Sequence, residues 1–291
     1  MAAHIWRGAL LAHTGHSVEA LSALGLVDHA PTVARQPYAN LHATLARAQA
    51  FALQGRSGEA LRLLATLDHD LAERGVVRFA GRIDNWKGWV LRNIGATGEA
   101  DECNERALAA ASSNGLHEAW ANALLDLADA AIRRVDLADA DRLLAEAAGQ
   151  EGHGHAFRWR HTQRRSLLQA RRHLAAGEEG QAGEALSELR NAGVLPTDRY
   201  GTITSILQAR IDARLGAPVE HASLMATITA LRTQAGLEAW WLVGELAADL
   251  GSEPVWQIAA SMLGELTVRA DDRSLVTATV NGRVLDALRP R

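Results

Sequence analysis

The segments Gly15-His-Ser-Val-Glu-Ala20, Gly55-Arg-Ser-Gly-Glu-Ala60 and Gly95-Ala-Thr-Gly-Glu-Ala100 repeat one pattern, a glycine followed four and five residues later by glutamate and alanine. They lie 40 residues apart in each case. The pattern continues at residues 135–140, where Val135 replaces the glycine, and then less regularly from Gly177, Gly216 and Gly251. A fixed period of this length predicts a chain built from repeated supersecondary units.

A small residue stands seven positions before each of these marks. These small residues are Gly8, Ala48, Gly88, Ala128, Ala170, Ala209 and Gly244. They lie in apolar runs with helical spacing, as in Leu41, Leu45, Ala48 and Phe51. The pattern predicts helical hairpins, because the glycine can end the first helix with a positive φ and the small residue lets two backbones approach.

We therefore expect an all-α fold, a right-handed α-solenoid of about seven antiparallel hairpins that forms one domain over residues 1–291. The expected hairpins span residues 1–36, 37–75, 76–115, 116–151, 155–195, 198–235 and 237–269, and a capping helix is expected at 272–288. The composition agrees with helices. The chain is 48% hydrophobic but has only eight Trp, three Phe and two Tyr, which leaves Ala, Leu and Val for the core.

The glycine, the acidic residue with its alanine, and the small residue resemble the tetratricopeptide repeat over nearly the whole chain. The usual period of that repeat is about 34 residues. The period of 40 is more similar to the long repeats in regulatory domains of large ATP-dependent bacterial transcription activators, including actinobacterial ones. Two late repeats depart from the pattern, because His221 and Trp256 replace the alanine. The resemblance implies a superhelical sensor or scaffold module.

Catalytic motifs are absent from the sequence. It contains no P-loop, no glycine-rich dinucleotide loop, no nucleophile elbow and no HExxH motif, so we expect a non-catalytic protein without a cofactor. The net charge of −4 disfavours binding of nucleic acid through overall charge. No apolar run is long enough to cross a bilayer and no secretory signal opens the chain, so we expect a cytoplasmic protein without membrane contact.

Histidine and cysteine give only weak candidates for chemistry. His153 and His155 lie in a glycine-rich segment with His161 nearby, where solvated histidines are the commoner arrangement and the spacing fixes no third ligand. Cys103 lies on an apolar helical stripe, where a small core residue is the commoner role. We therefore expect no metal site and a structural role for Cys103.

The first helix of each hairpin lines the concave surface in such a superhelix. One register carried along these helices begins with uncharged residues, namely Ala2, Ile5, Ala9, Ala12, His42, Leu45, Gln49 and Ala52. The later helices supply mostly polar and basic residues: Arg82, Asn85, Trp89, Arg92, Asn93, Asn122, Asp129, Arg133, Arg164, Arg171, Arg210 and Arg214. We predict that this later set, called the predicted groove set below, binds a ligand.

The chemistry of the predicted groove set indicates the kind of partner. An asparagine amide can donate to and accept from a peptide backbone, and an arginine binds a carboxylate or a phosphate with two donors. Trp89 would be the apolar anchor. We expect a protein or an extended peptide of acidic character as the partner. The alternative interpretation is that these side chains are solvated helix faces.

Residues 155–176 form a basic segment without an acid. It contains Arg158, Arg160, Arg164, Arg165, Arg171 and Arg172, with Phe157 and Trp159 between them. Basic and aromatic residues together could contact nucleic acid. We favour neutralisation by acids of the preceding repeat, within the chain or in a neighbouring copy, because arginines at this spacing surround the helix. These acids are Asp126, Asp129, Asp136, Asp139, Asp141 and Glu146.

Three classes of function follow from these observations. The first is a protein-binding or peptide-binding scaffold, the regulatory part of a bacterial transcription regulator. The second is a receptor for a short signalling peptide. An enzyme with an unrecognised site is the least supported class, because no spacing brings ionisable groups together.

Overall fold

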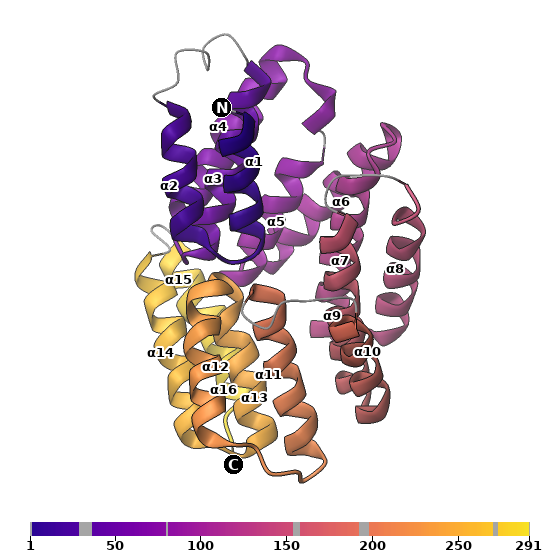
Figure 1. Cartoon of the computed structure of the whole chain (residues 1–291), viewed down its shortest axis with the longest axis vertical. Helices are drawn as coiled ribbons and strands as arrows, with labels where there is room; N and C mark the ends of the chain where they lie inside the picture. The colour runs from indigo at the N-terminus through magenta and orange to yellow at the C-terminus, as the bar shows by residue number, and fades with distance from the viewer. Residues whose placement is uncertain are drawn as a thin grey trace.

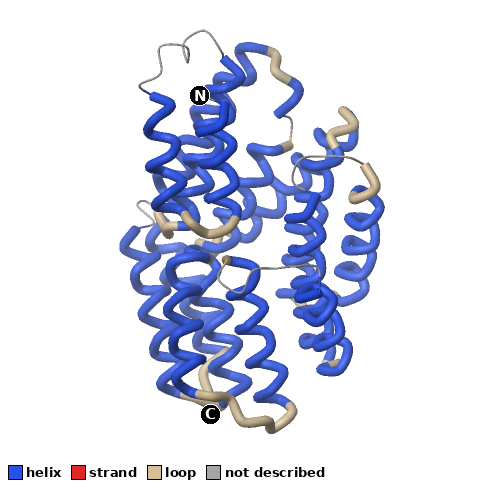
Figure 2. Tube along the Cα trace, viewed as in Figure 1, coloured by secondary structure: helices blue, strands red, loops and turns tan. Residues whose placement is uncertain are grey.

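The computed structural model describes residues 2–28, 37–79, 81–153, 158–191, 198–269 and 273–290. Figure 1 shows these residues as helices joined by short turns. The described part of the chain contains no strand, as Figure 2 shows, so the expectation of an all-α fold is confirmed. No described helix has the length and apolar character that a membrane span requires.

Successive helices pack against each other in neighbouring pairs. The pairs are α1 (Ala2–His13) with α2 (Ser17–Asp28), α3 (Pro37–Leu53) with α4 (Ser57–Arg74), α5 (Arg82–Asn93) with α6 (Thr97–Ser113), α7 (His117–Arg133) with α8 (Leu137–Gln150), α9 (Arg158–Ala176) with α10 (Glu179–Asn191), α11 (Arg199–Arg214) with α12 (His221–Gln234), and α13 (Ala239–Leu250) with α14 (Glu253–Arg269). From α1 to α13, each odd-numbered helix also contacts the next odd-numbered one. This arrangement is consistent with an α-solenoid.

The turns inside the pairs show why the repeat pattern carries a glycine. The backbone is left-handed at every mark of the pattern, with φ of +90° at Gly15 and +91° at Gly95. The remaining marks with positive φ are Gly55, Val135, Gly177, Gly216 and Gly251. The prediction that these residues end a helix with a positive φ is confirmed, and it holds even where valine replaces the glycine.

Small residues lie where the two helices of a pair cross. A Cβ atom on Gly88 would lie 2.5 Å from Oδ1 of Asn104, so no larger residue fits without a shift of that side chain. The alanines of the repeat pattern, Ala60, Ala100 and Ala140, have no exposed surface. Gly88 therefore lies at a close crossing of α5 and α6, and the three alanines are fully enclosed.

The C-terminal segment is helical from Ser274 to Ala287, close to the bounds expected for the capping helix, but its middle is π-helical. It consists of α15 (Ser274–Val276), the π-helical stretch η5 (Thr277–Asn281) and α16 (Gly282–Ala287). It covers the last pair, where Nε1 of Trp256 donates to the carbonyl of Leu285 at 2.9 Å. It also reaches the third pair, because Thr277 and Asn281 donate to the carbonyls of Ile94 and Asn93 at 2.9 Å each.

The first and last parts of the chain share an interface. The N–H of Arg199 donates to the carbonyl of Thr14 at 3.0 Å. The short 3₁₀ helix η3 (Gly236–Glu238) contacts α3 and α5. In Figure 1 the indigo and purple helices α1 to α5 lie above the orange and yellow helices α11 to α16, with α6 to α10 beside them. The inner faces of the odd-numbered helices therefore converge.

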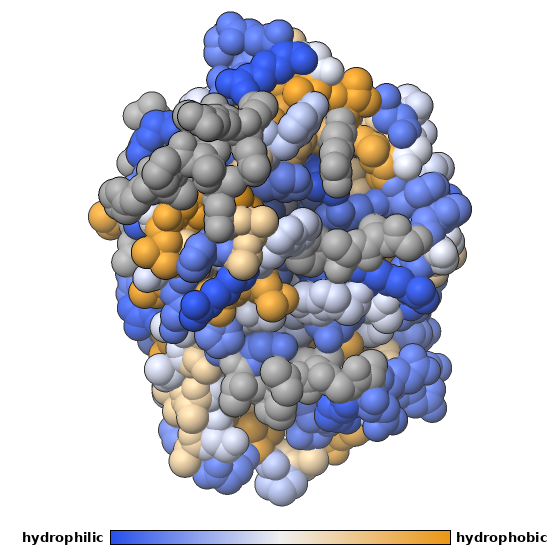
Figure 3. Space-filling model, turned by 45° about the horizontal axis from the view of Figure 1, so that its top comes forward, coloured by the Kyte–Doolittle hydropathy of each residue, from blue (hydrophilic) through white to orange (hydrophobic). Residues whose placement is uncertain are grey.

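Exposed apolar residues are distributed over several helix pairs, for example at Val135, Leu215 and Val268. Large hydrophobic side chains that are half exposed or more include Trp6, Val18 and Leu26 of α1 and α2. On the face seen in Figure 3, hydrophobic residues form separate patches among hydrophilic ones. A short 3₁₀ helix, η2 (Val77–Phe79), precedes α5 and places Phe79 in the core.

Candidate ligand-binding site

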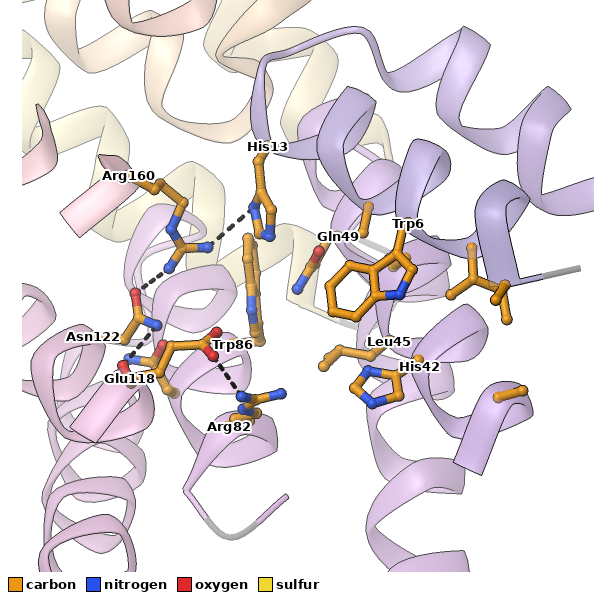
Figure 4. Close-up of a pocket in the computed structure, with 16 residues that line it drawn as sticks. Trp6, His13, His42, Leu45, Gln49, Arg82, Trp86, Glu118, Asn122 and Arg160 are labelled. Atoms are coloured by element: carbon orange, nitrogen blue, oxygen red, sulfur yellow. Dashed lines mark hydrogen bonds and ion pairs between the residues drawn. The ribbon is translucent and has the colours of Figure 1, made fainter. Parts of the chain in front are cut away.

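Five odd-numbered helices enclose a cavity of about 370 Å³ on their inner faces (Figure 4). Its volume lies within the usual range for a ligand pocket. The lining residues are Ala2, Ile5, Trp6, Ala9 and His13 of α1, Ala39, His42, Leu45, Ala46 and Gln49 of α3, Arg82, Asn85 and Trp86 of α5, Glu118 and Asn122 of α7, and Arg160 of α9.

The side of the cavity formed by α1 and α3 is apolar and aromatic. The ring centroids of Trp6 and His42 are 6.0 Å apart, and Leu45 is buried beside them. Trp6 is 50% exposed, so it lies at the edge of the cavity. The ring of Trp86 stacks on His13 with centroids 6.2 Å apart. These rings offer flat apolar surface to a ligand.

The opposite side, formed by α7 and α9, is polar. Arg160 donates to Nδ1 of His13 at 3.0 Å and to Oδ1 of Asn122. The carboxylate of Glu118 forms an ion pair with Arg82. In Figure 4 the ring of Trp86, seen edge-on, lies between this polar group and the group of Trp6, Leu45 and Gln49. The cavity is therefore amphipathic.

Gln49 brings an unpaired polar atom to the apolar side. It is 5% exposed, and its Oε1 has no hydrogen-bond partner among the described residues. A buried acceptor without a partner costs roughly 1–3 kcal/mol. Because Gln49 lines the cavity, an N–H group of a ligand could satisfy this atom.

The burial of His13 fixes its protonation state. Burial lowers the pKa of His13 well below its usual value, and the positive charges of Arg160, Arg199 and Arg82 lower it further. The imidazole is therefore neutral at pH 7. A neutral ring can accept the hydrogen bond from Arg160 at Nδ1, which places its own proton on Nε2.

Many residues of the register that the sequence predicts for the inner face line this cavity. Arg82, Asn85 and Asn122 of the predicted groove set line it. The uncharged positions of the same register also line it, namely Ala2, Ile5, Ala9, His42, Leu45 and Gln49. The cavity thus lies at the start of the inner face, whereas the sequence places the ligand against its basic middle.

Most other members of the predicted groove set interact with acids of the chain. Asp129 forms ion pairs with Arg133 at 3.2 Å and with Arg171 at 2.7 Å. The guanidinium groups of both arginines lie over the ring of Trp241, 4.3 and 4.2 Å from its centroid. The further ion pairs are Arg92 with Asp101, Arg164 with Asp126, Arg210 with Glu245 and Asp249, and Arg214 with Asp249. Their binding to an external acidic partner stays a prediction.

The two remaining members, Asn93 and Trp89, lie inside the structure. Asn93 donates to the carbonyl of Trp89 at 2.8 Å and accepts from Arg133. Trp89 is 6% exposed and belongs to the main core cluster, where Arg199 lies over its ring. The structure therefore differs from the expectation of Trp89 as an apolar anchor for a ligand. Trp86, on the same helix, is the tryptophan of α5 at the cavity.

The basic segment is neutralised within the chain, as we favoured. Arg164 and Arg171 pair with Asp126 and Asp129 of α7, and Arg172 pairs with Asp141 of α8. A further acid, Glu151, follows α8 and pairs with Arg165 at 2.7 Å. His155 and Phe157 lie outside the described residues. Among the described residues, these ion pairs engage every arginine of α9 except Arg158, which is exposed, and Arg160, which is buried.

Besides Ala39 and Ala46, the sequence register missed five cavity residues with larger side chains: Trp6, His13, Trp86, Glu118 and Arg160. All five lie four residues from a position that the register does include, namely Ala2, Ala9, Arg82, Asn122 and Arg164. A helix face one position wider would have contained them, because residues four apart share a face.

Two other candidates from the sequence behave as structural elements. Cys103 is buried, and burial raises the pKa of its thiol, so the thiol form predominates and its reactivity is low. His153 stacks on His117 with ring centroids 3.6 Å apart. Within the described ranges, no three side chains of histidine, cysteine or acidic residues are placed to hold a metal ion.

No protein-family model matches the chain, and no match to a curated protein was found.

Proposed function

We propose that the protein is a non-catalytic recognition module, a right-handed solenoid of about seven tetratricopeptide-like hairpins closed by its C-terminal segment. Its inner face binds a protein or peptide partner. The resemblance of the 40-residue repeat supports the role of a regulatory or sensor module in a cytoplasmic bacterial transcription regulator.

The observation that carries this proposal is the amphipathic cavity on the inner face. An apolar side chain of a partner would enter beside Trp6 and Leu45. A backbone N–H next to that side chain would donate to Oε1 of Gln49, which has no partner among the described residues. The combination of an apolar group with an amide donor is what a peptide offers.

A short peptide fits this geometry better than a broad protein interface. The cavity of about 370 Å³ holds a few side chains at most. Farther along the inner face, the arginines of α7, α9 and α11 already pair with acids of the chain, such as Asp129 and Asp249. The role of a receptor for a short signalling peptide is therefore the form of the proposal that the cavity favours.

Selection from a library of displayed random peptides tests this proposal. We expect enriched sequences that share an aromatic or branched apolar residue. Trp6→Ala should weaken their binding about tenfold or more, because it removes an aromatic wall of the cavity. Leu10→Ala is the matched control, since Leu10 lies on the same helix with a similar exposed fraction, 48% against 50%, and does not line the cavity.

The comparison of these two variants decides the outcome. Binding of the selected peptides measured by fluorescence polarisation should change less than twofold in Leu10→Ala. Equal binding by both variants, or the absence of a shared motif among the selected peptides, would show that the cavity does not recognise peptides.

A further inference from the structure

Arg160 is a buried cation that forms no ion pair with any acid among the described residues. Five arginines are buried in the described part of the chain: Arg92, Arg160, Arg171, Arg199 and Arg210. Four of them form an ion pair with a carboxylate, and the described residues offer no such partner to Arg160, which is 5% exposed. A buried charge is costly to hold unless an opposite charge offsets it.

Burial lowers the pKa of Arg160, and the charges around it offset this effect only in part, because Glu118 raises that pKa whereas Arg164 and Arg199 lower it. Arg160 donates to His13 and to the neutral amide of Asn122. His13 is neutral as well, because burial and the neighbouring arginines lower its pKa. Glu118 is the acid in the cavity wall, and it forms an ion pair with Arg82. Two arginines and one glutamate therefore leave the lining with a net charge of +1.

The guanidinium of Arg160 has hydrogen-bonding capacity left for a ligand. It carries five N–H donors, and two hydrogen bonds to other side chains use part of them. Its Nε is buried and has no hydrogen-bond partner in the part of the chain that the structure describes. A carboxylate can accept two hydrogen bonds from one guanidinium, which satisfies donors and charge together.

We propose that Arg160 is the anion receptor of this cavity, and that the ligand carries a carboxylate next to a flat apolar group. The inference rests on the proposed function and adds the charge of the ligand to it. The carboxylate would lie on the side of α7 and α9, and the apolar group beside Trp86 and Trp6 (Figure 4). A free aromatic acid and a peptide carboxylate beside an apolar side chain share this chemistry.

Matched probes separate the charge of the ligand from its shape. The first pair is 3-phenylpropanoate and its neutral amide. The second pair is the tripeptide acetyl-Gly-Gly-Phe with a free carboxylate and with an amidated end. Ligand-detected NMR and calorimetry on the full chain should show saturable binding of the acids in the millimolar range or tighter. We expect each acid to bind at least tenfold more tightly than its amide.

Substitutions test whether Arg160 makes this difference. Arg160→Gln removes the charge and retains N–H donors, so it should abolish the preference for the acids without lowering the melting temperature of the free protein. Arg158→Gln is the matched control, because Arg158 is exposed on the same helix, and it should keep the preference. Asn122→Asp supplies a carboxylate beside Arg160 and should also abolish binding of the acids while the chain stays folded.

Each result separates this inference from the proposed function. Equal binding of acid and amide, or an unchanged preference in Arg160→Gln and Asn122→Asp, would overturn the anion site while peptide recognition stands. Binding of 3-phenylpropanoate without binding of the tripeptide acid would support the anion site and contradict peptide recognition. Failure of all four probes to bind would overturn both.

Discussion

The protonation of one cavity residue, His13, should make the free energy of unfolding depend on pH. Its pKa is lowered well below 6.5 by burial and by Arg160, Arg199 and Arg82. Below pH 6.5 the unfolded chain therefore binds a proton at this residue that the folded chain does not bind. The sign follows from linkage: the free energy of unfolding falls as the pH drops below 6.5, by at most about 1.4 kcal/mol per pH unit.

The variant His13→Gln should flatten this pH dependence. Glutamine can still accept from Arg160 but does not titrate, so urea denaturation between pH 6.5 and 5 should show a smaller loss of stability than in the unmodified protein. His69→Gln is the control, since His69 is exposed and pairs with Glu73. Equal slopes in His13→Gln and the unmodified protein would show that His13 is not a buried neutral histidine.

For single residues, the sequence predicts part of the candidate ligand-binding site. Helical spacing alone places Ala2, Ile5 and Ala9 on the inner face with His42 and Leu45, and all of them line the cavity. The same spacing places Arg160 on the face of Arg164, but it could not show which groups surround Arg160, because its partner His13 lies 147 residues away in the chain. A periodic pattern reports which face a residue lies on, whereas the pairing of a charge depends on what tertiary folding brings to that face.

Among the turns between paired helices, one conflicts with local preference. Val135 has φ of +60°, a conformation in which other marks of the repeat carry glycine. A β-branched residue there is strained by roughly 1–2 kcal/mol. Glycine removes this strain but makes the unfolded chain more flexible, which offsets part of the gain. Val135→Gly should therefore raise the free energy of unfolding by about 0.5–1 kcal/mol.

Glycine introduced into a helix should instead lower the free energy of unfolding. Ala109 is exposed in the interior of α6, and Ala109→Gly should lower the free energy of unfolding by about 1 kcal/mol. Thermal and denaturant melts of both variants provide the comparison. A loss of stability in Val135→Gly would show that the valine side chain makes contacts that outweigh its backbone strain.

The turns between paired helices were the most predictable part of the fold. The period of 40 residues marks the left-handed turn at Gly15, Gly55 and Gly95, and the same offset still identifies Val135 after the glycine is lost. Each turn depends on residues close in sequence, so a local pattern is enough. The C-terminal segment has no counterpart in the repeat, and its π-helical stretch was not predicted.

The whole molecule differs from an open array of repeats, because its C-terminal segment is bound to its third helix pair. Thr277 and Asn281 donate to carbonyls at the end of α5 that lie 183 and 188 residues earlier. In an array with contacts only between neighbours, each repeat responds to its own neighbours. Here the closure couples the end of the chain to α5, and no periodic signal in the sequence could indicate it.

This closure predicts a long-range effect of one buried amide. Asn281→Ala removes the donor to the carbonyl of Asn93 and leaves that acceptor unpaired, which should cost about 1–3 kcal/mol. Hydrogen exchange should then accelerate in α5 as well as in residues 273–290. Asn114→Ala is the control, because Asn114 is exposed and its side chain donates within its own helix, so its effect should stay within about 0.5 kcal/mol. Faster exchange confined to residues 273–290 would show that the segment covers the last pair without stabilising α5.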